Sequence, residues 1–156
     1  MEIQLAEKKN LIEVIYIIRE CSRQFHEKGV KYWNSCLPDY NEIAEDIANQ
    51  RVYLMVNNRV TIGTITIKPE KTNPKTYEVS RLAIYPPFQN RGFAHEILKF
   101  SEDFAKKNGS TTLKGTVPID DTSTGLFLEE YGFINQGVEG DVPDEFTRIR
   151  FEKEIV

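Results

Sequence analysis

Apolar and polar residues near the start of the chain recur at the spacing of a helix. Between Asn10 and Glu27 one helical face would carry apolar or small residues throughout, at Leu11, Val14, Ile15, Ile18, Cys21, Ser22 and Phe25. The β-branched run Val14–Ile18 favours a strand instead. Because the stripe continues through the whole segment and charged residues occupy the other face, we predict a helix that Asn10 can cap and Gly29 ends. A shorter helix is predicted over about residues 40–49.

Segments rich in β-branched residues, several of them alternating with polar ones, predict the strands. They are Glu2–Ala6, Val52–Val56, Val60–Ile67, Thr76–Ile84, Thr111–Val117, Phe133–Val138 and Phe146–Phe151. Asn57 and Asn58 tolerate the positive φ of a two-residue hairpin turn between the second and third of these strands. Within the third strand the apolar parity slips at Gly63, which predicts a β-bulge or a bend there.

The stretch from Thr76 to Gly109 has the pattern of a strand, a tight loop and a helix. Two prolines after Tyr85 break the ladder, because proline has no N–H to donate. The loop is residues 89–94, and a last helix is predicted between Asp121 and Gly132. The resulting order, β-α-α-β-β-β-α-β-α-β-β, predicts an α/β fold. Its central sheet would be mixed but largely antiparallel, with six to seven strands and about four flanking helices.

Composition places the chain among ordinary globular domains. It has 156 residues, 40% of them apolar and 28% charged, which predicts one domain, residues 1–156, with a substantial core. The net charge is −4, and at most two basic residues are adjacent. A protein that binds nucleic acid would need a basic patch, so we expect no nucleic-acid partner.

The start of the chain and the cysteines bear on where the protein works. The first ten residues are too polar for a signal peptide, and the longest apolar run, Val14–Ile18, is far too short to cross a membrane. We therefore expect a cytoplasmic protein with no membrane partner, in which Cys21 and Cys36 are free thiols. Two histidines and the absence of a Cys-x-x-Cys pair give no basis for a metal site.

The loop of residues 89–94 is the strongest candidate for binding chemistry. A loop that opens a helix offers unpaired backbone N–H groups at the positive end of the helix dipole. Gly92 lets the backbone approach a ligand closely, Ala94 is small, and Gln89 and Arg91 add side-chain donors. Together they would cradle a phosphate or pyrophosphate, although one glycine before a helix is also typical of an ordinary loop.

This loop carries a resemblance to a known family. Residues 89–94 read Gln-Asn-Arg-Gly-Phe-Ala, which matches the Q/R-x-x-G-x-G/A signature of the GNAT N-acetyltransferase superfamily, and the preceding Leu-Ala-Ile-Tyr-Pro of residues 82–86 looks like that family's strand end. The resemblance implies a GNAT fold and acetyl-CoA as co-substrate. Its pyrophosphate would lie on the loop and its pantetheine arm along the strand end. The implied cofactor residues are Leu82, Ala83, Ile84, Gln89, Asn90, Arg91, Gly92, Phe93 and Ala94.

Acetyl transfer to an amine needs a base for the amine and donors for the tetrahedral oxyanion. Glu78 lies in the register that a catalytic glutamate occupies in the superfamily's histone acetyltransferases, so the resemblance implies that it is the base. The alternative is that Glu78 faces solvent or pairs with a lysine. Strand parity groups it with Ser80, Leu82 and Ile84 unless a bulge intervenes. The oxyanion donor would be a strand-end amide, and we favour that of Ile84.

A proton donor for the departing thiolate is where the sequence departs from the family. Anchored on Gly132 and Phe133, the family's later motif places Asp121 at its asparagine position and Leu128 at its tyrosine position. The resemblance implies that both contribute to the cofactor site, but leucine cannot donate a proton. Tyr131, one helical turn later, can substitute as the acid, and core packing is the alternative interpretation of its position.

The acceptor is the least defined partner. In small bacterial GNAT proteins the region between the first two helices overlies the acceptor site, so Tyr32 and Trp33 are candidates to shape a substrate pocket, with packing as the alternative. The expected acceptor is a primary amine on a small molecule or peptide, and the acidic tip at residues 139–145 slightly favours a cationic one. A homodimer is possible. Two other hypotheses are a non-catalytic CoA-binding module, suggested by Leu128, and a protein that binds another phosphate-bearing ligand through the loop alone.

Overall fold

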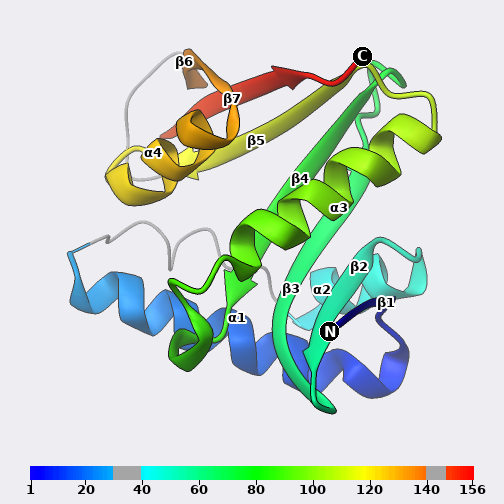
Figure 1. Ribbon diagram of the computed structural model, residues 1–156, viewed down its shortest axis with the longest axis vertical. Coiled ribbons are helices and arrows are strands. Elements are labelled where there is room, and N and C mark those ends of the chain that lie inside the picture. Colours follow the sequence, from blue (N-terminus) through cyan, green and yellow to red (C-terminus); the bar gives the residue numbers. More distant parts are fainter. Residues whose placement is uncertain (30–39, 140–146) are drawn as a thin grey trace.

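The protein forms a seven-stranded mixed sheet in a computed structural model that describes residues 1–29, 40–139 and 147–156. The strand order is β1-β2-β3-β4-β5-β7-β6, and β4–β5 is the one parallel pair among the described strands (Figure 1). The strands are β1 (Glu2–Leu5), β2 (Val52–Asn57), β3 (Val60–Pro69), β4 (Thr76–Ile84), β5 (Thr112–Pro118), β6 (Ile134–Glu139) and β7 (Arg148–Glu154). The predicted α/β fold and element order are confirmed, with boundaries shifted by at most three residues.

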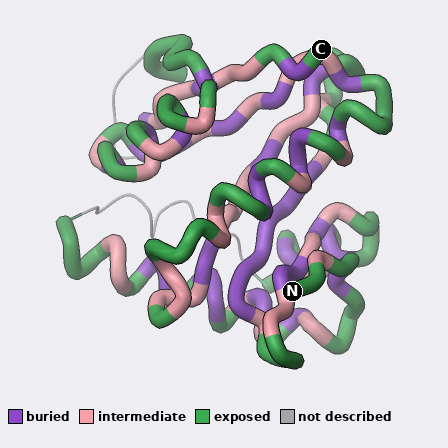
Figure 2. The backbone as a smooth tube through the Cα atoms, in the orientation of Figure 1, coloured by how far each residue is buried: buried purple, intermediate pink, exposed green. Residues whose placement is uncertain are grey.

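Four described α-helices cover the two faces of the sheet. They are α1 (Leu11–Glu27), α2 (Tyr40–Ala48), α3 (Phe93–Lys107) and α4 (Thr122–Tyr131). Buried residues of α1 and α2 form one apolar cluster with β2, and those of α3 and α4 form another with β3, β5 and β7. The buried sides of the helices face the sheet in Figure 2. Among the described residues, no helix combines the length and the apolarity that a bilayer crossing requires.

Local signals in the second and third strands were close to the observed structure. The hairpin turn between β2 and β3 uses Asn58 and Arg59, both at positive φ, and so lies one residue beyond the predicted pair. The register of β2 against β3 shifts beside Gly63, as the apolar parity predicted. A Cβ added to Gly63 would lie 2.8 Å from the Cδ1 atom of Ile84, so the glycine lets β3 and β4 approach closely at this point.

A second irregularity lies in β4 and reverses part of the predicted facing. Arg81 has a φ of +53°, and two residues of β4, Arg81 and Leu82, stand opposite one residue of β3. After this bulge the facing changes: Leu82 and Ile84 pack with the α3 cluster, whereas Ala83 packs with the α1 and α2 cluster. The simple parity that grouped Glu78 with Leu82 and Ile84 is therefore wrong, because the bulge adds a residue between them.

β4 and β5 stay together over only part of their length. Thr76–Glu78 pair with Thr112–Lys114, and beyond these residues the two strands diverge, as Figure 1 shows for the green and yellow strands below the C-terminus. The divergence exposes the edge of each strand to the other. It opens the centre of the sheet in front of the N-terminus of α3.

Candidate active site

A cleft of ≈ 260 Å³ occupies the space between the diverging strands. One wall is formed by residues 78–82 of β4 and the other by residues 115–118 of β5. Asp121, Thr124 and Leu128 of α4 close one side, and Ile18 of α1 reaches it from the other face of the sheet. The cleft thus brings together Glu78, Leu82, Asp121 and Leu128 from the predicted site.

The end of β4 directs backbone groups away from β3. The Tyr85 amide donates to the Ile62 carbonyl on β3 at 2.7 Å. Because ladder bonds alternate along an antiparallel pair, the N–H and C=O of the preceding residue, Ile84, point to the other side of the strand. That side is the one on which β5 has separated from β4.

The bulge frees a second set of backbone groups on the same strand. On β3, the Ile67 amide donates to the Arg51 carbonyl at 2.8 Å, on the side of β2. Because every second residue of a strand directs its N–H and C=O to the same side, those of Ile65 also point towards β2 and not towards β4. Leu82 lies opposite Ile65 and therefore has no ladder partner on β3. Leu82 lines the cleft whereas Ile84 does not, so Leu82 offers the better-placed amide for an oxyanion.

The loop before α3 has the geometry of an anion site. Asn90 and Gly92 have φ values of 62° and 86°, and the N-cap residue of α3, Gly92, has no side chain with which to cap the first turn. The first amides of α3 are therefore left for solvent or a ligand. A Cβ on Gly92 would have no atom within 4 Å, so the space over the loop is open. Arg91 is exposed, with its guanidinium carbon 5.5 Å from the centre of the Phe88 ring.

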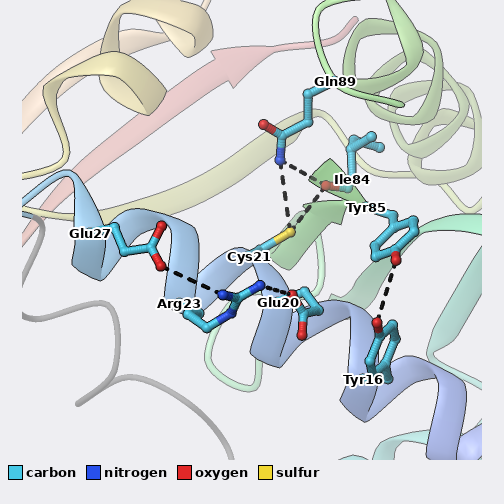
Figure 3. A network of polar contacts seen from close by, with 8 residues as sticks. All are labelled: Tyr16, Glu20, Cys21, Arg23, Glu27, Ile84, Tyr85 and Gln89. Carbon is cyan, nitrogen blue, oxygen red and sulfur yellow. Dashed lines mark hydrogen bonds and ion pairs between the residues drawn. The ribbon is translucent and has the colours of Figure 1, made fainter. Parts of the chain in front are cut away.

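Gln89 turns back from this loop to the strand end. Its side-chain nitrogen donates to the Ile84 carbonyl at 2.8 Å and lies 4.0 Å from the Cys21 sulfur. The Cys21 thiol donates to the same carbonyl at 3.1 Å (Figure 3). Burial raises the pKa of Cys21 to about 12, so the group remains a neutral thiol that can donate this hydrogen bond.

Glu78 is half-buried on the cleft wall. Lys68 of β3 and Lys114 of β5 stand directly opposite it in register. Lys114 pairs with Glu139 at 3.1 Å, and Glu78 takes part in none of the ion pairs between described residues. The carboxylate is thus available at the cleft, as a base requires.

Asp121 caps α4 with one oxygen and leaves the other unused. Its Oδ1 atom accepts from the Thr124 amide at 3.1 Å and from the Ser123 hydroxyl at 3.2 Å. Its Oδ2 atom is buried and has no hydrogen-bond partner among the described residues, although Asp121 is one of the residues that line the cleft. Leu128, which also lines the cleft, is 5% exposed and belongs to the apolar cluster under α3.

Tyr131 lies outside the cleft lining. Its ring centre is 5.1 Å from that of His95 and 5.9 Å from that of Phe133, and the Lys153 ammonium lies 5.3 Å from its centre. The hydroxyl is buried without a partner among the described residues, and burial raises the pKa of Tyr131 to about 12. This position favours the packing interpretation over the proton-donor one.

Arg81 is a site residue that the sequence did not reveal. Its guanidinium forms an ion pair with Asp46 of α2 and lies 3.6 Å from the Glu42 carboxylate, and the residue also lines the cleft. Arginine at positive φ is uncommon, so nothing in the strand pattern predicted a bulge at this residue. The predicted acceptor residues Tyr32 and Trp33 lie outside the described residues.

A family model for an acetyltransferase (GNAT) domain matches residues 21–152. The chain belongs to the GNAT acetyltransferase family. No curated protein matches it in sequence. Solved GNAT structures share its fold at low identity. The PaiA N-acetyltransferase from Thermoplasma acidophilum in complex with coenzyme A has a TM-score of 0.80 at 19% identity, with 98% of each chain covered. YncA, a putative acetyltransferase from Salmonella typhimurium with acetyl-CoA, has a TM-score of 0.74 at 18% identity, covering 100% of this chain and 94% of its own.

Proposed function

We propose that this GNAT protein is an acetyl-CoA-dependent N-acetyltransferase that acetylates a primary amine by direct attack within a ternary complex. The observation that carries the proposal is the continuity of two features. The cleft between β4 and β5 exposes the backbone of β4, and the uncapped start of α3 follows β4 directly in the chain. An extended arm that ends in a pyrophosphate fits both at once.

The residues of the site fit such a cofactor part by part. The first amides of α3, with Asn90, Arg91 and Gly92 before them, would hold the pyrophosphate. The backbone of Leu82 and the N–H of Ile84 would hydrogen-bond the pantetheine arm along the edge of β4. The buried Oδ2 atom of Asp121 would accept a hydrogen bond from an amide N–H of that arm, which gives its missing partner. Two structural neighbours were crystallised with coenzyme A or acetyl-CoA, which supports the assignment.

In the proposed reaction the acceptor amine gives up a proton to Glu78, directly or through a water molecule. The amine nitrogen then bonds to the thioester carbonyl carbon, and the Leu82 amide stabilises the oxyanion that forms. As this intermediate collapses, the nitrogen releases its second proton to water, the carbon–sulfur bond breaks, and the thiolate leaves and takes a proton from water. Leu128 contributes shape to the cleft but no proton, so no side-chain acid is assigned.

The test is a thermal-shift titration with acetyl-CoA on the wild type and on Gly92→Glu. A ligand that binds only the folded state raises the melting temperature, and a carboxylate on the loop repels the pyrophosphate. Gly109→Glu is the matched control, because Gly109 has a φ of +81° and equally open surroundings at the far end of α3. We expect a shift in the wild type and in Gly109→Glu that Gly92→Glu loses. No shift in a folded wild type would end the proposal.

A second candidate is a non-catalytic CoA-binding module, which the leucine at position 128 favours. Both candidates bind the cofactor, so turnover separates them. Release of free thiol from acetyl-CoA on a panel of polyamines, amino acids, aminoglycosides and peptides supports the enzyme. Binding without thiol release on the whole panel supports the module. A panel member that is acetylated also identifies the acceptor class, to which Tyr32 and Trp33 are proposed to contribute.

A further inference from the structure

We propose that Gln89 is a positioning residue rather than a phosphate ligand, and that it works with Cys21 to hold the end of β4. The three groups involved are the Gln89 amide, the Ile84 carbonyl and the Cys21 thiol, which we call the strand-end brace. Figure 3 shows them converging from the cofactor loop, from β4 and from α1. The inference rests on the proposed function, because it concerns how that cofactor site is held in shape.

The brace consists of two donors on one acceptor. Gln89 and Cys21 both donate to the Ile84 carbonyl, at 2.8 and 3.1 Å, which uses both lone pairs of that oxygen. This carbonyl points away from β3, towards the side where the strands diverge. With the carbonyl occupied, the strand end presents the Ile84 N–H to a ligand but not its C=O. The brace therefore decides which backbone group the cofactor arm can use.

The brace also links three segments that are distant in sequence. Cys21 is 1% exposed in the middle of α1, Ile84 ends β4, and Gln89 begins the phosphate loop. A side chain that donates to Ile84 at 2.8 Å directs its nitrogen to the strand end and not to the open space over Gly92. The loop and the strand end are thus set relative to each other by a side chain before any ligand arrives.

Arg91 belongs to the same loop as Gln89 but is not part of the strand-end brace. Its side chain is exposed, and its guanidinium carbon lies 5.5 Å from the centre of the Phe88 ring in the same turn. Arg91 and Gln89 are two residues apart and both were expected to donate to the phosphate. Of these two residues, Arg91 is the one whose side chain remains placed to contact the phosphate. Arg91 is therefore the matched control.

The experiment is a double-mutant cycle read by calorimetric binding of acetyl-CoA. Gln89→Met keeps the length of the side chain and removes its donors, and Cys21→Ala removes the thiol. We expect each variant to weaken binding about threefold to tenfold, as the loss of one hydrogen bond allows. The double variant should be no more than about twofold weaker than the poorer single variant, because both act through one carbonyl. Cys21→Ser keeps a donor and should restore binding to within about twofold of the wild type.

Binding of ADP, which carries a pyrophosphate but no pantetheine arm, separates the two roles of Gln89. The brace predicts that Gln89→Met changes ADP affinity by less than about twofold, whereas Arg91→Met weakens ADP and acetyl-CoA binding alike. Equal losses of ADP and acetyl-CoA affinity in Gln89→Met, with additive effects of Gln89→Met and Cys21→Ala, would overturn the inference and leave the proposed function standing. The same cycle measured on urea unfolding without ligand should also be non-additive, and additivity there contradicts the brace even in a protein that binds no acetyl-CoA.

Discussion

The two walls of the cleft are held in place by different forces. The β4 wall contains a residue at positive φ, Arg81, and is held by polar contacts to α1 and α2 through Cys21 and Asp46. The facing wall of β5 and α4 also carries the buried Asp121 carboxylate, but we call it the apolar wall because Val117 and Leu128 belong to the apolar core under α3, with Gly115 buried beside them. Directional contacts thus fix the wall that offers backbone donors, whereas close packing shapes most of the facing wall, on which Asp121 is the residue proposed to bind the cofactor arm.

This difference also explains where the chain can depart from the family pattern. Leucine stands at the position of the family's tyrosine on the apolar wall. Leu128 is 5% exposed there and lines the cleft. The β4 wall, which we call the polar wall, keeps the features that the proposed chemistry uses: the Glu78 carboxylate and the amide of Leu82, which has no ladder partner on β3. Because the proposed catalytic groups lie on β4, the reaction would not depend on the residue at position 128 of α4 as long as the cleft remains open.

The largest expected effect on cofactor affinity comes from closing the cleft at the apolar wall. A Cβ on Gly115 would lie 3.7 Å from Val79 and 3.9 Å from Leu128, which is ordinary contact, so Gly115→Ala fits. Gly115→Leu has to extend its side chain further into the cleft. We expect acetyl-CoA affinity to fall by at least about 30-fold in Gly115→Leu and less than about threefold in Gly115→Ala, measured by calorimetry. Unchanged affinity in a folded Gly115→Leu protein would place the pantetheine arm elsewhere.

The next prediction separates the cost of backbone strain at Arg81, on the polar wall, from the contribution of its ion pair. Arg81→Ala leaves the Asp46 carboxylate, whose side chain is 10% exposed, without its closest cation, and keeps a non-glycine residue at positive φ. We expect a loss of about 3 kcal/mol in the free energy of unfolding. Arg81→Gly loses the same ion pair but relieves the backbone, so it should be about 1 kcal/mol more stable than Arg81→Ala in urea unfolding. The reverse order of the two variants would show that the bulge is not strained.

A smaller effect is expected behind the apolar wall, where Glu102 ties α3 to β7. Its side chain is 4% exposed and pairs with Lys153 and, at 3.2 Å, with Lys99. Burial alone would raise the pKa of Glu102, but these two lysines outweigh it and lower the pKa below the ordinary 4.5. Folding therefore favours the ionised carboxylate, and its contribution is complete above pH 4.5 and disappears as the pH falls through the lowered pKa.

Glu102→Gln should accordingly cost about 2 kcal/mol of unfolding free energy at pH 7, and less as the pH is lowered below 4.5. Asp103→Asn is the matched control, because Asp103 also pairs with Lys99, at 3.3 Å, but is 52% exposed. Its effect should stay within about 0.5 kcal/mol at every pH. Denaturant unfolding between pH 3 and pH 7 measures both variants, and equal costs at the two ends of this range for Glu102→Gln would refute the linkage.

The sequence predicted the fold and the loop that opens α3 because both depend on local patterns. Helical stripes and β-branched runs located the elements, and the Gln89–Ala94 signature located the uncapped start of α3. The bulge at Arg81 was not predictable in this way, because arginine has no preference for positive φ and the partners Asp46 and Glu42 come from a distant helix. For the same reason the contact of Gln89 with Cys21 and Ile84 became visible only in three dimensions.

The smallest effect is expected at Tyr131, where spacing and position disagree. One helical turn separates it from Leu128, yet its hydroxyl is buried outside the cleft with no partner among the described residues. Removing an unpaired buried hydroxyl costs little, so Tyr131→Phe should stay within about 0.5 kcal/mol of the wild type in stability, or exceed it. Tyr131→Ala, which loses the ring contacts with His95 and Phe133, should cost about 3 kcal/mol.

Once an acceptor is found, Tyr131→Phe should keep its turnover within about twofold, because a phenol whose pKa is about 12 and which lies outside the cleft supplies no proton to the thiolate. A large loss of turnover with unchanged acetyl-CoA affinity would make Tyr131 the acid after all and would assign chemistry to both walls.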